Sequence, residues 1–534
     1  MSQIPLLLGG LALFLYGMNQ MGKGLELLAG NKLQGILEKL TNKKLLGILV
    51  GAIVTAIIQS SSATTVMAVG FVSSKILTLT QAVYIIMGAN IGTTVTGLLL
   101  TLDIDLIAPF FAFIGMVMQL FIKKRKYKYA GTIIFGFGVL FMGMDIMGNA
   151  VKPLSENPTF INIIAGARNP FVGIIIGALF TAIIQSSSAT TGILITLALN
   201  GLLTFDVAFY LVLGQNIGTC ITSVLASMGA SKNAKRVAVT HVTFNLIGVI
   251  IFATLSFILP IKPWIESWSN EISLQIAYMH TFFNVVTTIL LIPFTNLLVK
   301  VSHTVVKGED AKDSGLKLLY INPTLYHDAI ITLPSIKQEI LRMLDYAKSN
   351  LKMSIQNILE FDEDNSADLE YNEEVIDYLN TEITRISVKT MTNNLSKTQY
   401  KHLSYYLKIC SNIERLGDYA YNINALSKDM YDKKMKFTNP GQQEILETSI
   451  VLNRLFDEII ISLRDGVFDI KKIRTTAFKI QDLADSHREN HLERMKSGLC
   501  TPEAGLAFDK FYAYLLRVRD HLINVANQFS TIHE

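Results

Sequence analysis

The sequence is poor in cysteine, in net charge and in recognisable catalytic motifs. Its 534 residues include three cysteines, Cys220, Cys410 and Cys500, which lie far apart and lack the spacing of a zinc site or a disulfide framework. The net charge is only +4, so the composition gives no reason to expect a nucleic-acid partner. Because no nucleotide-binding loop or catalytic triad is recognisable either, we do not expect an enzyme.

Charge is also scarce along most of the first 300 residues. Apolar runs long enough to cross a bilayer alternate there with short charged loops, whereas residues from about 301 onward have the charge density of a soluble helical protein. The first run, IPLLLGGLALFLYGM, has no basic segment before it, so it predicts a membrane span and not a cleaved signal peptide. The sequence therefore predicts a membrane domain at 1–300, a linker at 301–324 and a soluble domain at 325–534.

One string occurs twice in the membrane half. Residues 55–65 and residues 181–191 both read TAIIQSSSATT, an offset of 126 positions. The same offset relates GANIGTT at 88–94 to GQNIGTC at 214–220, and GMNQMG at 17–22 to GMDIMG at 143–148. The chain therefore carries a repeated unit, with repeat one at about 1–125 and repeat two at about 126–259.

The apolar runs predict seven spans and one surface helix. The surface helix is expected at 23–44, where five lysines accompany leucines at helical spacing. The spans are expected at 4–22, 80–101, 106–122, 129–148, 206–229, 235–259 and 276–299, and the last of these has no counterpart in the repeat.

The basic loops predict the orientation in the membrane. Lysine and arginine gather at 23–44, 123–128 and 231–236, whereas the loops at 102–105 and 201–206 carry neither. All basic loops fall on one side only if each QSSS segment is a re-entrant hairpin that enters and leaves by the same face. The N-terminus is then outside, the C-terminus is cytoplasmic, and the second repeat is inverted relative to the first. Inverted repeats with matched interrupted helices are typical of secondary transporters, whose substrate lies near the midplane.

The QSSS strings place uncharged oxygens where each hairpin should turn. A helix that starts at such a turn directs free N–H groups to the midplane, and helix N-termini favour anions. The hydroxyls and the Gln59 and Gln185 amides could also ligate a small hard cation through oxygen. Neither hairpin contains a carboxylate or a histidine, which a proton relay would normally need, so Na+ is favoured as the coupling ion. Close helix packing through small polar residues is the alternative interpretation.

Other polar residues of the membrane half allow two interpretations each. The NIGT strings, with Asn90 and Thr93 in repeat one and Asn216 and Thr219 in repeat two, interrupt apolar spans and either line the site as breaks or pack helices together. The H-x-x-F-N pairs at 241–245 and 280–284 favour hydrogen-bonded packing between helices. Gly51 and Gly177 also favour packing contacts.

These motifs resemble those of the type II sodium–phosphate cotransporters. The resemblance covers roughly residues 1–300 and rests on the paired QSSSATT strings with GANIGTT and GQNIGTC behind them. That family has inverted repeats and forms its sodium and phosphate sites from the two QSSS regions. The resemblance implies one half-site at Gln59, Ser60, Ser61, Ser62, Thr64 and Thr65 and another at Gln185, Ser186, Ser187, Ser188, Thr190 and Thr191. Cys220 stands where repeat one has Thr94, so a hydroxyl ligand is missing there.

The soluble half predicts six helices, at 334–360, 365–393, 398–430, 440–470, 474–497 and 503–530, arranged as two three-helix units. NIERLGDYAYNI at 412–423 resembles the signature of PhoU, a helical regulator of bacterial phosphate uptake, and LLRVRDHLINVA at 515–526 resembles a weaker second copy. The resemblance implies a divalent or iron ion held by E-x-x-x-D pairs, here Glu373, Asp377, Glu414 and Asp418. A solvated acidic face is the alternative.

Taken together, the sequence predicts an all-α polytopic membrane protein followed by a PhoU-like helical bundle. The resemblance implies sodium-coupled phosphate symport by alternating access across the bacterial cytoplasmic (inner) membrane. The expected partners are inorganic phosphate, Na+ and the lipid bilayer, and a homodimer through either domain stays open. Phosphate export, a non-transporting phosphate sensor and a different oxyanion are the alternatives.

Overall fold

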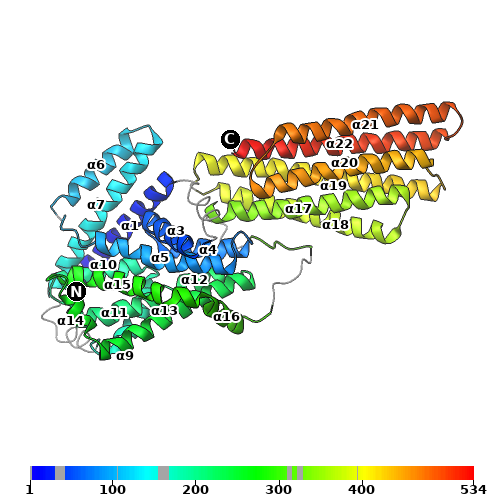
Figure 1. The fold of residues 1–534 in the computed structure, drawn as a ribbon. Coiled ribbons are helices and arrows are strands. Elements are labelled where there is room, and N and C mark those ends of the chain that lie inside the picture. The colour runs from blue at the N-terminus through cyan, green and yellow to red at the C-terminus, as the bar shows by residue number, and fades with distance from the viewer. Residues whose placement is uncertain are drawn as a thin grey trace. The chain divides into compact units, whose positions relative to one another are not determined.

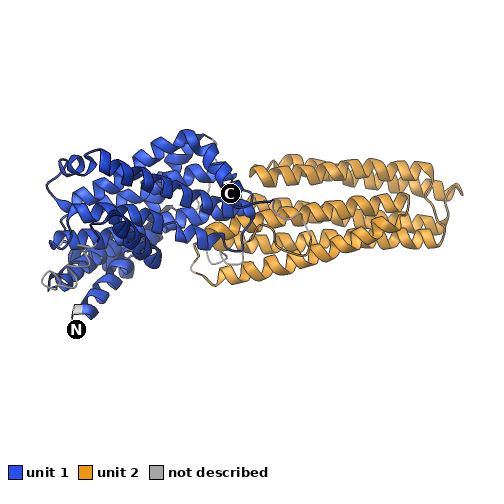
Figure 2. Ribbon diagram, turned by 90° about the horizontal axis from the view of Figure 1, so that it is seen from below, with its two compact units in different colours: residues 1–310 blue, residues 311–534 orange. Residues whose placement is uncertain are grey.

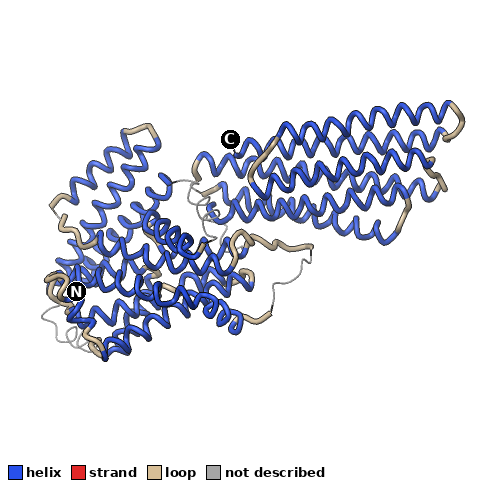
Figure 3. The backbone as a smooth tube through the Cα atoms, in the orientation of Figure 1, coloured by secondary structure: helices blue, strands red, loops and turns tan. Residues whose placement is uncertain are grey.

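The fold is known from a computed structural model, and every element in its described part is a helix (Figures 1 and 3). The chain divides into two compact units, residues 1–310 and residues 311–534 (Figure 2). The described residues are 3–29, 43–104, 106–153, 167–308, 315–321, 329–393 and 395–533.

The first unit is a bundle of long and short apolar helices. Its helices are α1 (Gln3–Ala29), α3 (Lys44–Ile58), α4 (Ser61–Ser73), α5 (Leu79–Leu99), α6 (Ala108–Phe121), α7 (Arg125–Val151), α9 (Pro170–Ile184), α10 (Ser187–Leu199), α11 (Phe205–Gly218), α12 (Ile221–Ser227), α13 (Lys232–Ile258), α14 (Ile261–Glu266), α15 (Ile272–Leu291), the 3-10 turn η2 (Ile292–Phe294) and α16 (Thr295–Val305).

Six helical segments in the described residues are long and apolar enough to cross a membrane, and they coincide with six of the seven predicted spans. The seventh predicted span, at 106–122, stays a prediction: the helix there is α6, which has only 14 residues because it starts after the Asp103 loop and stops before the lysine run. At 1.5 Å per residue it is about 21 Å long, short of the roughly 30 Å bilayer core. The predicted surface helix also differs, since α1 continues to Ala29; residues 30–42 lie outside the described part.

Glycine sets how closely the helices of each repeat approach one another. The α3–α5 contact in repeat one and the α9–α11 contact in repeat two are matched glycine for glycine, 126 positions apart. A β-carbon on any of these glycines would collide with a backbone carbonyl oxygen of the facing helix. The pairs are Gly51 with Ile85, Gly88 with Ile48 and Gly92 with Ala52, and then Gly177 with Leu211, Gly214 with Ile174 and Gly218 with Ala178. The packing interpretation of Gly51 and Gly177 is therefore confirmed.

Helices α1 and α7, which carry corresponding sequences of the two repeats, pack against each other. Gly10 lies against Gly143 and Gly17 against Gly136, and each glycine of a pair contacts the carbonyl oxygen of the other. Rising residue numbers in α1 meet falling numbers in α7, so the two helices run antiparallel. Because Gly10 corresponds to Gly136 and Gly17 to Gly143 in the repeat, the contact is reciprocal, as at a two-fold interface.

The second unit consists of six long helices around one core. These are α17 (Ala329–Leu359), α18 (Glu363–Met391), α19 (Lys397–Asp432), α20 (Asn439–Asp465), α21 (Ile470–Lys496) and α22 (Pro502–His533), and the six predicted helices are confirmed. Pro440 and Pro502 lie in the first turns of α20 and α22, where a missing N–H costs nothing. A single apolar cluster extends through all six helices, so the predicted pair of three-helix units shares one core.

We expect Gly88→Val to destabilise the first unit by more than about 3 kcal/mol, because the new side chain forces α3 and α5 apart at backbone contact. Gly9→Ala is the matched control, since a β-carbon there meets nothing within 4 Å. Thermal unfolding in detergent, followed by the fluorescence of Trp264 and Trp268, measures the difference. Equal melting temperatures for the two variants would contradict the packing role.

Candidate functional site

Each QSSS string breaks a helix at one residue in the left-handed conformation. Gln59 ends α3 with φ 58° and ψ 27°, and Gln185 ends α9 with φ 59° and ψ 23°. The serine that follows caps the next helix: the Ser60 hydroxyl accepts from the Ala63 N–H at 3.1 Å, and the Ser186 hydroxyl accepts from the Ala189 N–H at 3.2 Å. Non-glycine residues rarely adopt positive φ, so the matched conformations mark a constrained site.

The chain bends sharply at both breaks. The Thr55 hydroxyl donates to Thr64 Oγ1 at 2.9 Å, and the Thr181 hydroxyl donates to Thr190 Oγ1 at 3.0 Å. In a continuous helix, residues nine apart would be separated by about 13.5 Å along the axis. In both segments the helix is therefore bent at the break, and one threonine–threonine hydrogen bond joins the two arms.

The two breaks meet at one cavity of about 480 Å³. Its lining includes residues 59–63 of the first hairpin, residues 185–188 of the second, and Asn19, Lys23 and Glu26 of α1. The Ser62 hydroxyl donates directly to the Gln185 carbonyl oxygen at 3.2 Å. Segments 126 positions apart thus contribute to a single site, and the N-terminal ends of α4 and α10 both border it.

The cavity offers hydroxyl donors, uncharged oxygen acceptors and two helix N-termini. Such a surface can hold an oxyanion through N–H and O–H donors, and a hard cation through hydroxyl, amide and carbonyl oxygens. The two glutamines differ: Gln59 is buried, with its Oε1 accepting from Thr96 at 2.9 Å, whereas Gln185 is exposed. Lys23 and Glu26 are the charged residues in the lining.

The predicted threonines and asparagines lie behind the cavity lining. Thr65 and Thr191 are buried, and their hydroxyls donate to carbonyls of their own helices, as do those of Thr93 and Thr219. The asparagines lie deeper: Asn90 Nδ2 donates to Asn245 Oδ1 at 3.3 Å, and Asn216 Nδ2 donates to the Val212 carbonyl at 2.8 Å. None of these residues is among those that line the cavity.

The predicted interruption of the spans at the NIGT strings is correct in one repeat only. Helix α5 passes through Asn90 and Thr93 without a break, whereas α11 ends at Gly218 and α12 begins at Ile221. Sequence reasoning also missed Thr96, which holds Gln59, and Gln215, whose Nε2 donates to Thr191 Oγ1 at 2.8 Å. Gln215 could have been found, because it stands where repeat one has Ala89.

A second cavity, of about 430 Å³, lies at the far end of α10. Helix α10 begins at the QSSS cavity with Ser187 and reaches this second cavity with Thr196, Leu199 and Asn200. Its charged lining residues are Asp103, Asp145, Lys152 and Glu271. Asp145 accepts from Asn149 Nδ2 at 3.2 Å and is exposed.

The four carboxylates predicted to hold metal in the second unit do approach one another. Burial, followed by the charges of Asp377, Asp418 and Glu414, raises the pKa of Glu373 from 4.5 to about 8. A β-carbon on Gly417 would collide with the Glu373 carboxylate, so a larger residue there would displace that side chain. However, no group of three or more metal-ligating side chains in the described residues is placed to hold an ion, and Arg415 pairs with Asp418 at 3.1 Å. The metal interpretation is therefore unsupported.

The second copy of the signature contains an arginine side chain among its polar residues. Arg519 stands 102 positions after Gly417, and its guanidinium donates to Gln481 and to Asp520. The second copy of the signature thus has Arg519 where the first copy has Gly417 beside the Glu373 carboxylate.

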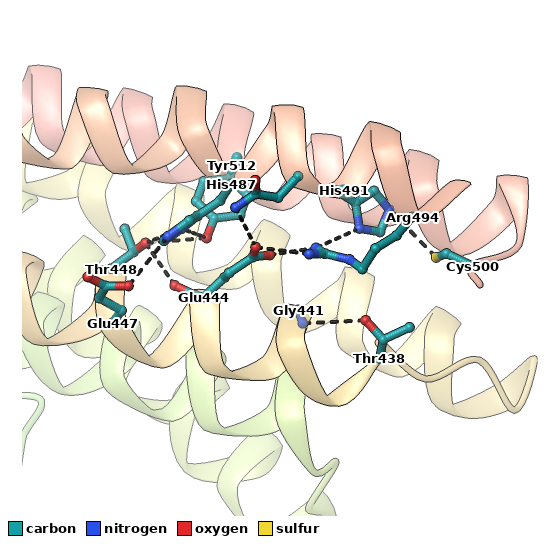
Figure 4. Close-up of polar contacts among 11 residues, drawn as sticks. Thr438, Gly441, Glu444, Glu447, Thr448, His487, His491, Arg494, Cys500 and Tyr512 are labelled. Atoms are coloured by element: carbon teal, nitrogen blue, oxygen red, sulfur yellow. Dashed lines mark hydrogen bonds and ion pairs between the residues drawn. The ribbon is translucent and has the colours of Figure 1, made fainter. Parts of the chain in front are cut away.

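Another titratable cluster joins α20, α21 and α22 (Figure 4). Glu444 and Arg494 form a mostly buried ion pair at 2.5 Å, and the Tyr512 hydroxyl meets both His487 Nδ1 at 2.9 Å and the Thr448 hydroxyl at 3.3 Å. Cys500 lies at the edge, and burial raises the pKa of its thiol, which disfavours the nucleophilic thiolate. We interpret this cluster as packing, because its members bind one another.

Comparison with known proteins identifies both halves. The model of the Na+/Pi-cotransporter family matches residues 13–149 and 155–265, and the model of the PhoU domain matches residues 340–426. The uncharacterized protein YqeW of Bacillus subtilis is 33% identical over 297 residues, which cover 55% of this chain and 96% of that protein.

Two further relatives have names that concern phosphate. The inorganic phosphate export protein YjbB of Salmonella typhimurium, whose name is provisional, is 24% identical over 498 residues, covering 92% of this chain and 90% of that protein. The sodium-dependent phosphate transport protein 2B of Homo sapiens is 32% identical over 171 residues, covering 30% of this chain and 24% of that protein.

We expect the thermal stability of the second unit to fall as the pH rises from about 4.5 to about 8. Because folding raises the pKa of Glu373, the folded state binds a proton there that the unfolded state releases across this range. Glu373→Gln should remove part of this fall and raise the melting temperature at pH 8.5 by about 3 °C. Calorimetry of the full chain in detergent, with Glu374→Gln as the exposed neighbouring control, measures it. A lower melting temperature for Glu373→Gln at pH 8.5 would contradict the assignment.

Proposed function

The chain belongs to the Na+/Pi-cotransporter family and carries a PhoU domain, and from this premise we propose that it is a sodium-coupled symporter of inorganic phosphate. It is a multi-pass membrane protein that moves phosphate by alternating access between the two faces of the bilayer. The observation that carries the proposal is the single cavity lined by both QSSS strings.

Phosphate binds between the two hairpins. The N-terminal ends of α4 and α10 and the hydroxyls of residues 60–62 and 186–188 supply donors to its oxygens. Sodium binds to uncharged oxygens of the same strings and of the threonines behind them, and offsets the charge of the entering anion. The residues assigned to these roles are Gln59, Ser60, Ser61, Ser62, Thr64, Thr65, Asn90, Thr93, Gln185, Ser186, Ser187, Ser188, Thr190, Thr191, Asn216 and Thr219.

The two repeats are inverted relative to each other and each hairpin is re-entrant. The antiparallel, reciprocal glycine contact between α1 and α7 supports this arrangement, because corresponding helices of inverted repeats point in opposite directions. With the N-terminus outside, the QSSS cavity opens to the cytoplasm beside Lys23, and the cavity at Asp103 and Lys152 lies at the external face. Helix α10 then separates the two points of access.

The PhoU-like domain at 325–534, reached through the linker at 301–324, regulates this flux from the cytoplasmic side of the bacterial inner membrane. The match of a PhoU domain in the same chain as a transport domain supports a regulatory role.

Export is the second candidate direction, because a relative that covers most of the chain has an export name. The scaffold and the site stay the same, and only the driving gradient differs. A membrane sensor that binds phosphate without moving it, and a different transported oxyanion, are outcomes that the same experiment separates.

The test is radiolabelled phosphate uptake into proteoliposomes, with an inward Na+ gradient compared with an equal choline gradient. Sodium-dependent uptake that sulfate does not compete supports the symporter. Loss of preloaded phosphate without sodium dependence supports export, and binding in detergent without flux supports the sensor. Competition by sulfate would show that the transported substrate is a broader class of oxyanions than phosphate alone.

We expect Gln59→Ala and Gln185→Ala each to lower sodium-dependent uptake at least about tenfold, because each removes an amide that lines the cavity at the helix break. Thr132→Ala in α7 is the matched control, since its hydroxyl binds only Lys128 of its own helix and lies outside both cavities. Monodisperse elution of each variant checks folding. Uptake at the wild-type rate in either glutamine variant would remove the hairpins from the site.

A further inference from the structure

Helices α13 and α15 hold the same polar pair at their buried faces. Helix α13 packs against the first hairpin helix α4, and α15 packs against the second hairpin helix α10. His241 and Asn245 on α13, and His280 and Asn284 on α15, are at most 2% exposed. In each pair the asparagine Nδ2 donates to the carbonyl oxygen of the histidine four residues earlier, at 3.1 Å and 2.8 Å. The two helices therefore carry equivalent polar pairs and pack against the two QSSS segments, although α13 belongs to repeat two and α15 lies outside both repeats.

On the α13 side Asn245 and one ring nitrogen of His241 are bonded to neighbouring helices, whereas His241 Nε2 has no partner among the described residues. Asn245 Oδ1 accepts from Asn90 Nδ2 of α5 at 3.3 Å, and its Nδ2 also lies 3.3 Å from Cys220 Sγ. His241 Nδ1 forms a 2.9 Å hydrogen bond with the Ser223 hydroxyl of α12. Helix α13 is thus bonded to the NIGT helix of repeat one and to the corresponding end of repeat two.

On the α15 side the corresponding bonds are missing. Asn216, the counterpart of Asn90, donates to Val212 of its own helix, and Asn284 Oδ1 has no hydrogen-bond partner among the described residues. Gly97 occupies the position that matches Ser223, and His280 Nδ1, which lies beside it, is likewise unpartnered in the described part. The asparagine Oδ1 and the histidine Nδ1 are therefore bonded on the α13 side and unpartnered on the α15 side.

This difference between chemically equivalent pairs has a conformational interpretation. An unsatisfied buried acceptor is costly, so a second arrangement in which Asn284 finds a donor is favoured on that side. In alternating access built from inverted repeats, each half adopts in one state the arrangement that the other half has in the opposite state. The bonded Asn245 and the unbonded Asn284 fit one of the two states of such a transporter.

We propose that Asn245 and Asn284 are paired positioning residues that select between the two access states. The Asn245–Asn90 bond stabilises the state in which the QSSS cavity is open beside Lys23. When the cavity at Thr196 opens instead, the Asn245–Asn90 bond breaks and an Asn284–Asn216 bond replaces it. The inference rests on the proposed alternating access and names the residues that bias it.

Cysteine accessibility in detergent tests the exchange. Met18→Cys reports on the QSSS cavity, whose wall includes Met18, and Thr196→Cys reports on the opposite cavity, where Thr196 is only 4% exposed. Both probes are placed in a Cys500→Ser chain, because Cys220 and Cys410 are buried. The measurement is the rate of modification by a charged methanethiosulfonate reagent.

We expect Asn245→Ala to raise the ratio of Thr196→Cys to Met18→Cys labelling about fivefold, the effect of one lost buried hydrogen bond. Asn284→Ala should lower the ratio by a similar factor, since it removes the bond of the other state. Asn90→Ala breaks the same bond as Asn245→Ala from the other side and should reproduce its shift if Asn245→Ala does not fold. Thr243→Ala, whose hydroxyl binds Val239 within α13, is the control and should leave the ratio unchanged.

The inference is overturned if Asn245→Ala and Asn284→Ala shift the ratio in the same direction, or if neither shifts it. Its failure is distinct from failure of the symporter. If uptake is driven by sodium but the labelling ratios do not shift, the asparagine exchange is refuted and the proposed transport function stands. Opposite shifts in a chain that shows no sodium-driven uptake support the exchange and remove sodium coupling.

Discussion

The architecture of the first unit depends on the cost of an unpaired backbone group in a bilayer. No water is available at that depth, so a break in a helix is tolerated only where protein or a hydrated cavity supplies partners. Each QSSS break supplies several of these partners itself: a left-handed glutamine ends one helix, a serine caps the next, and a threonine pair joins the two helices across the break. The remaining partner comes from the other repeat, through the bond from Ser62 to Gln185. The atoms that line the cavity are therefore the same atoms that supply hydrogen-bond partners at the two helix breaks.

Much of this could be predicted from the sequence because the repeat is so well preserved. Eleven identical residues at a fixed offset indicate where the chain must break, and the glycines at the same offset indicate where helices must touch. Helix positions in the second unit followed from apolar periodicity and from two prolines at helix starts. Repeats, glycine spacing and helix periodicity can be read from short stretches of the chain, so they can be predicted without knowing which helices pack together.

The missed features are those that depend on partners distant in the chain. Thr96 and Gln215 contact the QSSS segments from other helices; Thr96 lies outside the repeated GANIGTT string, and Gln215 replaces Ala89 within it. The break after Thr219 has no equivalent after Thr93, although both strings read NIGT, so the surrounding packing decides it. The four carboxylates around Glu373 were predicted to hold a metal ion, but Asp418 pairs with Arg415 and Glu373 accepts from Asn350. Spacing on one helix cannot reveal what a neighbouring helix contributes.

The bond from Ser62 to Gln185 has a consequence for how the chain is made. The two residues lie 123 positions apart, and synthesis proceeds at about 5–20 residues per second. The first hairpin therefore leaves the ribosome roughly 6–25 s before the residue that completes it. During that interval its polar turn needs a temporary host, such as the insertion machinery or the aqueous boundary of the bilayer. The first repeat therefore cannot complete its folding until the second repeat has been synthesised and inserted.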